Sequence, residues 1–490
     1  MQIGTLAPHP LDAPTPPPIG WGMTDAAARR DTAFIGHPIG LGWLTISEMF
    51  ERFSYYGMQA LLVLYMTGFL FKPAHVGQVW GFATFRRLLE VGGPMTPLAL
   101  GSAIFGLYTS AVYITPILGG LIADRLIGRT RTVIAGAVLM ALGHFLMAFE
   151  QSFLIALTCL IFGTGLFKGN ISSQVGDLYG EADPRRADAF QIFLFAIQIA
   201  GIVTPLVCGT LGEVYGWHWG FGAAGIGMLV GLAAYLAGRP TFPADPKAKG
   251  ADPAHASAPP LGANDWRKIA VLAALVPILA MSMVGNQQGF NVMLIWAKSA
   301  YQLSFFGHTM PVTWLLSIAG VVSAMTIAAS AGFWRWWATR WAEPDELSKI
   351  ILGVTLMVGG QLVLAAASTV IAATGHRVGL GWAMAFNILN CFGFANMLPI
   401  GMALFSRAAP KGTASTVIGL YYLNNFAANL AVGWLGGFYE KMTPAAFWLM
   451  HAGIMATAVV LLILVKLTVG AHLAPAYDAP MGDAEPLPAT

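Results

Sequence analysis

Long apolar stretches separated by short polar ones recur from residue 41 to residue 468. Each is close to the ~20 residues that an α-helix needs to cross a bilayer. Strands of a membrane barrel would be shorter and would alternate apolar with polar positions, so the pattern predicts an all-α membrane protein. We place twelve transmembrane helices at residues 41–71, 97–123, 132–150, 152–179, 189–212, 219–238, 268–297, 311–334, 350–373, 379–406, 413–438 and 446–469.

The polar segments divide the chain into two blocks of helices. Residues 239–265 are rich in Ala, Pro, Asp, Lys and Gly, and we expect them to be a cytoplasmic linker. They separate an N-terminal six-helix bundle (37–238) from a C-terminal one (266–470). The Pro-rich residues 1–36 and the tail 471–490 are expected to be disordered and cytoplasmic. Two six-helix halves fit the major facilitator fold, in which the substrate site lies near the membrane midplane between the halves.

One polar insertion interrupts this plan between the first two predicted helices. Residues 72–96 contain the amphipathic run VGQVWGFATFRRLLE, which is too charged to span a bilayer. We expect an interfacial or gate-covering helix on the periplasmic side. A plain long loop is an equally good interpretation.

Composition and charge agree with this topology. The chain is 56% hydrophobic and 10% charged, whereas soluble domains carry about 25% charged residues. Most lysines and arginines fall on one side of the predicted spans, and bacterial proteins keep such loops in the cytoplasm. We therefore expect a multi-pass protein of the bacterial inner membrane with both termini cytoplasmic. The lysines and arginines on the opposite side are Lys72, Arg86, Arg87, Lys298, Arg377 and Lys441.

Away from the ends of the predicted spans, two basic residues and two acidic ones lie inside them. Glu48, Glu51 and Arg52 are three and four residues apart, so they share one face of the first helix. A charge at the bilayer centre costs ~2.5–3.5 kcal/mol on insertion scales, so this face must point to the bundle interior or to a water-filled cavity. Lys168 supplies a second base from the fourth helix. Together the four groups are formally neutral, which a low-dielectric cavity tolerates best.

These segments resemble the proton-dependent oligopeptide transporter (POT) family. The first helix reads Glu48-x-x-Glu51-Arg52-Phe-Ser-Tyr55-Tyr56-Gly57 and is similar to the family's E-x-x-E-R-F-x-Y-Y-G motif. The run GTGLFKGNIS around Lys168 is similar to its G-x-G-x-x-K-P-N-x-S segment, with Gly in place of Pro. Weaker similarities follow in the right order, so the likeness covers most of residues 37–470.

The resemblance implies proton-coupled uptake of di- and tripeptides by alternating access. It implies that Arg52 and Lys168 hold the terminal carboxylate of the peptide, and that Glu48 and Glu51 take part in proton coupling. The polar and aromatic positions expected to line the pocket are Tyr55, Tyr56, Gln59, Tyr113, Gln198, Asn286, Gln287, Asn390, Phe394, Tyr421 and Asn425.

The turn between the second and third helices resembles the G-x-x-x-D-R-x-x-G-R/K turn of the major facilitator superfamily. Asp124, Arg125 and Arg129 occupy its charged positions. Ion pairs with neighbouring helix ends would latch the cytoplasmic side in one state. The alternative is that these charges only anchor the topology.

The C-terminal half departs from the family because its predicted spans contain no carboxylate. On the seventh helix the family has a glutamate in an E-Q-x-G context, whereas this chain has Asn286-Gln287-Gln288-Gly289. Its usual arginine partner on the first helix is Gln59 here, so we expect a Gln59–Gln287 hydrogen bond. The glutamate of the tenth helix is replaced by Phe394 or, with a short gap, by Asn396. Amide oxygens and aromatic faces hold an ammonium group more weakly than a carboxylate does.

These departures keep an alternative open, namely a relative that carries another organic anion or a drug-like solute. An enzyme is excluded, because there is no H-E-x-x-H, no pair of catalytic aspartates and no phosphate-binding loop. We expect no cofactor, no metal and no nucleic-acid partner. The expected partners are a short peptide, a proton and the lipid bilayer, and the protein is expected to function as a monomer.

Overall fold

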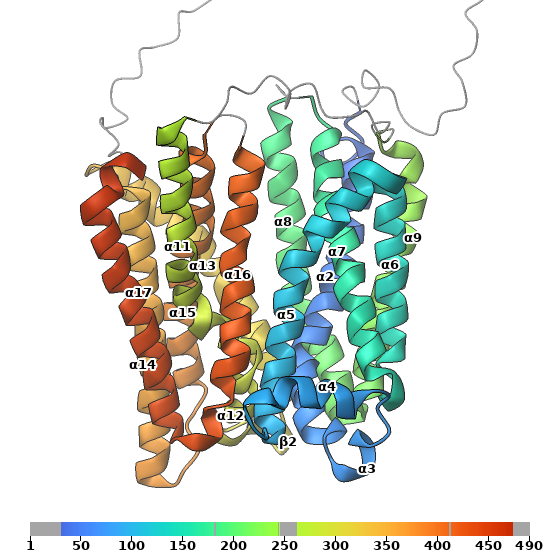
Figure 1. Ribbon diagram of the computed structural model, residues 1–490, viewed down its shortest axis with the longest axis vertical. Helices are drawn as coiled ribbons and strands as arrows, with labels where there is room; N and C mark the ends of the chain where they lie inside the picture. The colour runs from blue at the N-terminus through green and yellow to red at the C-terminus, as the bar shows by residue number, and fades with distance from the viewer. Residues whose placement is uncertain (1–30, 181–182, 244, 246–261, 411–412, 474–490) are drawn as a thin grey trace, which may run out of the picture.

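The computed structural model describes residues 31–180, 183–243, 245, 262–410 and 413–473, and helices dominate this part of the chain (Figure 1). Most of the expected tails and the centre of the expected linker lie outside the described residues. Twelve helices of 18 to 30 residues form the body of the described chain. They are α2 (Ile39–Tyr65), α5 (Pro97–Ile122), α6 (Arg129–Leu146), α7 (Phe153–Asp177), α8 (Arg185–Thr204), α9 (Trp217–Gly238), α11 (Ala263–Gln287), α13 (Trp314–Ala338), α14 (Glu346–Thr374), α15 (Gly381–Ala408), α16 (Ala414–Gly436) and α17 (Pro444–Leu473).

Nine of the helices in the described residues are long and apolar enough to cross a membrane. The three long helices outside this group are α2, α6 and α16. Helix α2 carries Glu48, Glu51 and Arg52 near its middle, which lowers its hydropathy. Each predicted apolar segment falls on one of the twelve long helices, so the prediction of an all-α, multi-pass membrane protein is confirmed.

The predicted span 268–297 is wrong as a single helix. Helix α11 ends at Gln287, the 3-10 turn η8 (Gln288–Phe290) follows, and α12 (Val292–Ala300) begins after Asn291. Asn291 has φ −117° and ψ −113°, which is outside the helical region. Its side-chain amide donates to Gln288 Oε1 at 3.0 Å and also to Ser102. Both acceptors are side-chain atoms, so these bonds hold the Asn291 side chain at the break between α11 and α12.

Helix α8 also departs from regular geometry. It ends at Thr204, and two π turns, η5 (Pro205–Gly209) and η6 (Leu211–Tyr215), continue the segment. Proline has no backbone N–H and therefore interrupts the i to i−4 ladder, and single π turns often relieve such an interruption.

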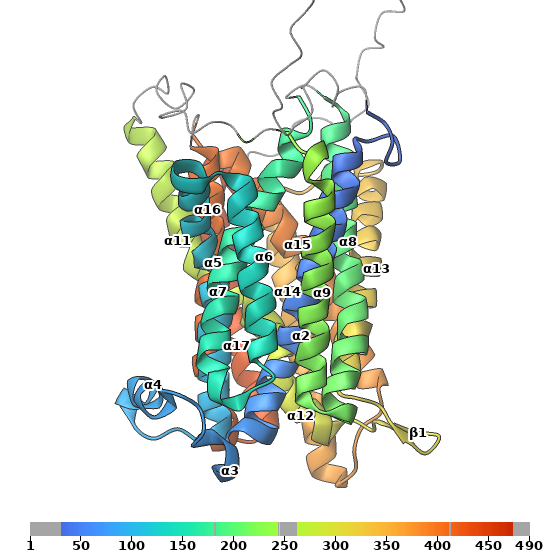
Figure 2. The same ribbon diagram turned by 90° about the vertical axis from the view of Figure 1, so that its right-hand side faces the viewer.

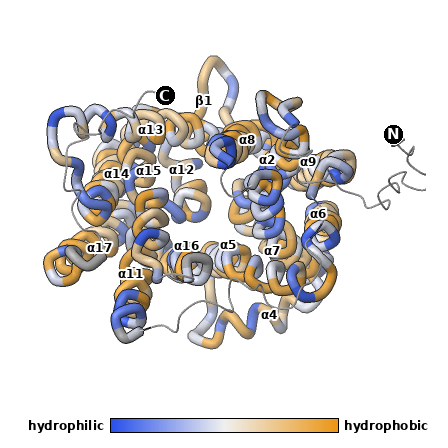
Figure 3. Tube along the Cα trace, turned by 90° about the horizontal axis from the view of Figure 1, so that it is seen from above, coloured by the Kyte–Doolittle hydropathy of each residue, from blue (hydrophilic) through white to orange (hydrophobic). Residues whose placement is uncertain are grey.

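The helices form two bundles that lie side by side (Figures 1 and 3). Helices α2 and α5–α9 make up the N-terminal bundle, and α11 with α13–α17 make up the C-terminal bundle. Buried apolar side chains of the N-terminal bundle form one large core, whereas those of the C-terminal bundle are divided among smaller clusters. Helix α2 begins and α17 ends at one end of the molecule, which we call the terminal side. The opposite end carries α3 and α4 and is called the insertion side (Figure 2).

Helices α5 and α16 join the two bundles. A Cβ atom on Gly106 would lie 2.5 Å from the Cα atom of Gly433, so only glycine permits this approach. Ser110 donates a hydrogen bond to the carbonyl oxygen of Phe426 at 2.9 Å. Both contacts cross from the N-terminal to the C-terminal bundle, and the two helices form a seam there.

The insertion 72–96 forms a short helix, α4 (Phe82–Leu89), preceded by α3 (Pro73–Val76) and followed by the 3-10 turn η2 (Glu90–Gly92). Phe82 packs into the N-terminal core, whereas Leu88 is 69% exposed. The helical alternative for this segment is therefore the observed one. The backbone N–H of Met95 and the Arg86 guanidinium both donate to Glu90, and they lower the pKa of its carboxyl.

The remaining short elements connect the long helices. They are η1 (Met66–Leu70), η3 (Ala123–Ile127), η4 (Glu150–Ser152), η7 (Arg239–Thr241), η9 (Tyr439–Lys441) and the hairpin of β1 (Ser304–Phe305) and β2 (His308–Thr309). In the hairpin, Ser304 pairs with Thr309 and Phe305 with His308. Its turn residues Phe306 and Gly307 both have positive φ angles, as in the tight turns that suit twisted strands.

Candidate functional site

The charged face of α2 points into the protein. Glu48, Glu51 and Arg52 are 2%, 0% and 4% exposed. The Arg52 Nε atom lies 3.2 Å from Glu48 Oε1 and donates a hydrogen bond to Glu51. Its guanidinium carbon lies 5.1 Å from the ring centre of Tyr55. The spacing predicted from the sequence therefore produces a buried ion cluster, as the cost of exposing charge to lipid requires.

Some polar atoms of this cluster are free to form further hydrogen bonds. Among the described residues, Glu48 Oε2, Glu51 Oε1 and Arg52 Nη2 have no hydrogen-bond partner. An unpaired guanidinium nitrogen suits a carboxylate, which accepts two parallel bonds from arginine. An unpaired carboxylate oxygen can carry a proton. The cluster therefore has the groups needed to bind one anion and one proton.

Lys168 enters the site from α7. Its Nζ atom lies 4.8 Å from the ring centre of Tyr113 on α5, and it interacts electrostatically with Arg52 and both glutamates of α2. Within the described residues, Lys168 has no ion pair within 4.0 Å. The ammonium group is thus held near the cluster by the ring of Tyr113, a cation–π contact, and it remains available to a substrate anion.

Glycines position this lysine. A Cβ atom on Gly119 would lie 2.0 Å from the carbonyl oxygen of Gly165, and one on Gly165 would lie 2.6 Å from the Cβ of Thr115. Helices α5 and α7 can therefore approach closely, as small residues allow in membrane bundles. This approach brings Tyr113 and Lys168 together.

Other predicted lining residues belong to the N-terminal bundle. The rings of Tyr55 and Tyr56 are 5.6 Å apart. Gln59 is 5% exposed, and Gln198 on α8 is half-buried. The predicted hydrogen bond between Gln59 and Gln287 is not observed between these two described residues.

The C-terminal bundle contributes amides. Gln287 donates to Asn425 Oδ1 at 3.4 Å, so α11 and α16 are tied within their own bundle. Asn390 is 5% exposed, and its Oδ1 atom has no partner among the described residues. Asn286 and Phe394 are half-buried. This side therefore presents neutral acceptors and an aromatic ring.

Two candidate residues of the C-terminal bundle are engaged elsewhere. Tyr421 is fully buried, and its hydroxyl donates to the carbonyl oxygen of Leu398 at 2.6 Å. Asn396 Oδ1 accepts from Ser330 at 3.1 Å and from Trp334 Nε1 at 2.6 Å. Both side chains stabilise packing inside the bundle.

The charged turn on the terminal side is held within the N-terminal bundle. Arg129 donates to Asp177 at the end of α7, and its Nε atom lies 3.8 Å from Asp124 Oδ1. Asp245 accepts from the backbone N–H and the hydroxyl of Thr130 at about 3 Å. These contacts join α5, α6 and α7 to one another.

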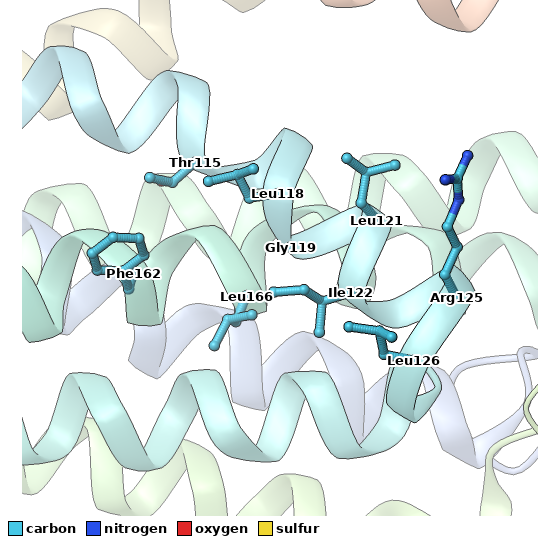
Figure 4. Close-up of a pocket in the computed structure, with 9 residues that line it drawn as sticks. All are labelled: Thr115, Leu118, Gly119, Leu121, Ile122, Arg125, Leu126, Phe162 and Leu166. Carbon is cyan, nitrogen blue, oxygen red and sulfur yellow. The ribbon is translucent and has the colours of Figure 1, made fainter.

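A cavity of about 370 Å³ lies between α5 and α7 beside this turn (Figure 4). Arg125 is its charged member, and its other lining residues are Thr115, Leu118, Gly119, Leu121, Ile122, Leu126, Phe162 and Leu166. None of the predicted peptide-binding residues lines it. It is therefore distinct from the buried ion cluster.

Two polar residues that the sequence did not single out make contacts between helices in the structure. Glu213 follows the predicted span 189–212, yet its carboxylate binds backbone groups of the C-terminal bundle. His144 on α6 is fully buried and bonds Ser54 on α2. Glu213 could have been noticed in the sequence, because it comes directly after a predicted span on the side that has few lysines and arginines.

Comparison with known proteins relates this geometry to a family of transporters. The POT family model matches residues 130–258. Peptide transporter YePEPT of Yersinia enterocolitica subsp. palearctica is 28% identical, with the alignment covering 88% of this chain and 94% of that protein. A di-/tripeptide transporter of Lactococcus lactis subsp. cremoris is 25% identical over 89% of this chain and 97% of that protein.

Solved structures are similar over nearly the whole chain. A crystal structure of a peptide transporter POT in complex with sulfate has a TM-score of 0.78 at 25% identity. The match covers 92% of this chain and 99% of that one. A mutant of a peptide transporter POT in complex with alafosfalin has the same TM-score, identity and coverage.

Proposed function

This chain belongs to the POT family, and on that premise we propose that it is a secondary active transporter that carries di- and tripeptides inward together with protons. The observation that carries the proposal is the buried cluster of Glu48, Glu51 and Arg52, which lies near Lys168. Buried ionisable residues inside a membrane bundle mark ion and substrate pathways. The protein is a transporter and not an enzyme.

The proposed topology follows the distribution of basic residues. The terminal side faces the cytoplasm and the insertion side faces the periplasm of a bacterial cell, in accordance with the positive-inside rule. The two bundles rock about a central site, as in other transporters built from two halves, and one chain is sufficient.

The proposed coupling rests on charge balance. The two glutamates, Arg52 and Lys168 are together neutral. The substrate carboxylate binds Arg52 Nη2 and Lys168 and adds one negative charge. A proton on Glu48 or Glu51 cancels that charge, so that the bundles can close around a neutral site without an unpaired buried charge.

The amino terminus of the peptide binds the amide side of the site. Asn390 supplies an oxygen acceptor that has no partner among the described residues. Asn425 supplies one that also accepts from Gln287, and Phe394 supplies an aromatic face. These groups hold an ammonium more weakly than a carboxylate would. This feature favours a second candidate function, the transport of another organic anion that lacks a free amine.

Uptake by purified protein in liposomes tests the proposal. An inward proton gradient should drive accumulation of radiolabelled dipeptides above the external concentration, and a proton ionophore should abolish it. A panel of free and N-acetylated dipeptides separates the two candidates, because equal competition by both favours the anion. If no peptide accumulates in response to the gradient, the peptide proposal is wrong.

A further inference from the structure

Glu213 connects the two bundles at the insertion side. Its Oε1 atom accepts from the backbone N–H of Thr313 at 3.0 Å and from the Thr313 hydroxyl at 2.7 Å. Its Oε2 atom accepts from the backbone N–H of Val312 at 3.1 Å. Glu213 belongs to the N-terminal bundle and its partners to the C-terminal bundle. Three hydrogen bonds therefore converge on one carboxylate across the interface.

The partners of Glu213 lie at the start of helix α13. The bonded N–H groups belong to Val312 and Thr313, directly before α13 begins at Trp314, and the helix dipole favours negative charge there. Thr313 is the N-cap of α13, and its own side chain does not cap the helix. Glu213 supplies the anion from the opposite bundle, and hydrogen bonds to an ionised acceptor are the stronger kind.

Neighbouring contacts extend this connection along the same pair of segments. Trp314 Nε1 donates to Thr210 Oγ1 at 2.8 Å, and Ser317 donates to the carbonyl oxygen of Ile202 at 2.7 Å. A Cβ atom on Gly209 would lie 2.0 Å from Thr313 Oγ1, so the segments are in tight contact. Glu213 is the charged member of this row.

We propose that Glu213 is the latch of the periplasmic gate. The ionised carboxylate holds the start of α13, and it must leave this helix terminus before the bundles can separate on the insertion side. Its charge therefore biases the transporter toward the arrangement that is closed to the periplasm. Gln59 and Gln287 stand where the family has a charged pair, and both are neutral in this chain. Glu213 would supply a charged contact between the bundles in place of that pair. The proposal rests on alternating access as proposed above, but it concerns a conformational equilibrium and needs no substrate.

Distance measurements between spin labels test the latch directly. Cysteines at the exposed Ala148 and Ala373 report on the insertion side, and cysteines at Ala187 and Thr339 report on the terminal side. The half-exposed Cys159 is replaced by serine in every variant. Double electron–electron resonance on full-length protein in lipid nanodiscs then gives the population of each arrangement without a peptide.

Glu213→Gln should shift the populations toward an open insertion side and a closed terminal side, by at least about tenfold, the effect of losing hydrogen bonds to a charged group. Thr313→Val removes one donor and keeps the side-chain shape, so it should cause a smaller shift in the same direction. The matched control is Glu150→Gln, which removes a carboxylate on the same side that bonds His75 within the N-terminal bundle. It should leave the populations unchanged.

Wild-type distance distributions in both Glu213→Gln and Thr313→Val would overturn the latch, as would an equal shift in Glu150→Gln. If Glu213→Gln does not fold, the result with Thr313→Val decides. A shift in a protein that accumulates no peptide would support the latch while refuting the proposed substrate. The two proposals therefore fail independently.

Discussion

The two bundles contribute different chemistry to the central site. In the N-terminal bundle, α2 and α7 place two acids and two bases within electrostatic reach of one another. In the C-terminal bundle, α15 and α16 place neutral amides. Many of these amides already bond the backbone of their own helix, as Asn387 bonds Ala383 and Asn429 bonds Asn425. Charge recognition is therefore confined to one half, and the other half supplies shape and weak polar contacts.

This asymmetry has a physical consequence for transport. A buried ion cluster is costly to break, because loss of one partner leaves an uncompensated charge. An amide costs less to leave partly unsatisfied. The carboxylate end of a substrate should therefore be recognised strictly and its amine end loosely. Four predictions, in order of decreasing effect, test this comparison.

The largest effect is expected when the acids of α2 are neutralised. Glu51→Gln and Glu48→Gln should each abolish accumulation driven by a proton gradient, which for one coupled proton amounts to about tenfold per pH unit. Exchange of peptide across the membrane should continue, since the glutamine is neutral like the protonated acid and the loaded site therefore stays neutral. Proteoliposome uptake and counterflow measure both properties. Glu150→Gln, in a loop of the same bundle, is the control, and wild-type accumulation in both site variants would refute the coupling scheme.

The next effect concerns Arg52. Arg52→Lys keeps the charge but loses the planar group that contacts both glutamates and the ring of Tyr55. The concentration for half-maximal dipeptide uptake should rise about tenfold or more, as expected for lost charged hydrogen bonds. Concentration dependence of uptake measures it. An unchanged half-saturation would mean that Arg52 acts only as structural charge compensation.

A smaller effect is expected from adding charge to the C-terminal bundle. Asn390→Asp converts an acceptor that lacks a partner into a carboxylate of the same shape. Preference for free over N-acetylated dipeptides should rise severalfold, on the order of 1 kcal/mol. Competition assays with both peptide types measure the ratio. Asn396→Asp, on the same helix at an oxygen that already accepts from Ser330 and Trp334, should not change it. An equal ratio in both variants would contradict the assignment of the amine side.

The smallest effect is expected from changes to the ring of Tyr113, which contacts the ammonium group of Lys168. Tyr113→Phe keeps the aromatic face and should leave half-saturation within about twofold, whereas Tyr113→Leu should raise it about threefold, as a cation–π contact of 0.5–1 kcal/mol predicts. Initial uptake rates at several peptide concentrations measure both. Equal values for the phenylalanine and leucine variants would show that the ring does not position the lysine.

The helices could be predicted from the sequence because the bilayer leaves few alternatives. Without water, each backbone group must be paired within its own segment, so a long apolar run specifies a helix. The break at Asn291 was not predicted, since the side chain of this residue bonds Gln288 and also Ser102 on the distant α5. Hydropathy records no such contact.

In the candidate site, too, some features follow from local sequence and others depend on contacts between distant segments. The sequence by itself determined that Glu48, Glu51 and Arg52 share a buried face and that the second half lacks a matching acid, because helical spacing and the cost of buried charge are local properties. The tertiary structure alone decided which groups are engaged. It directed Tyr421 and Asn396 into packing contacts, placed Lys168 against Tyr113, and brought Glu213 to the start of a helix about one hundred residues later in the chain. These outcomes depend on which helices meet and at what height, and no local pattern contains that information.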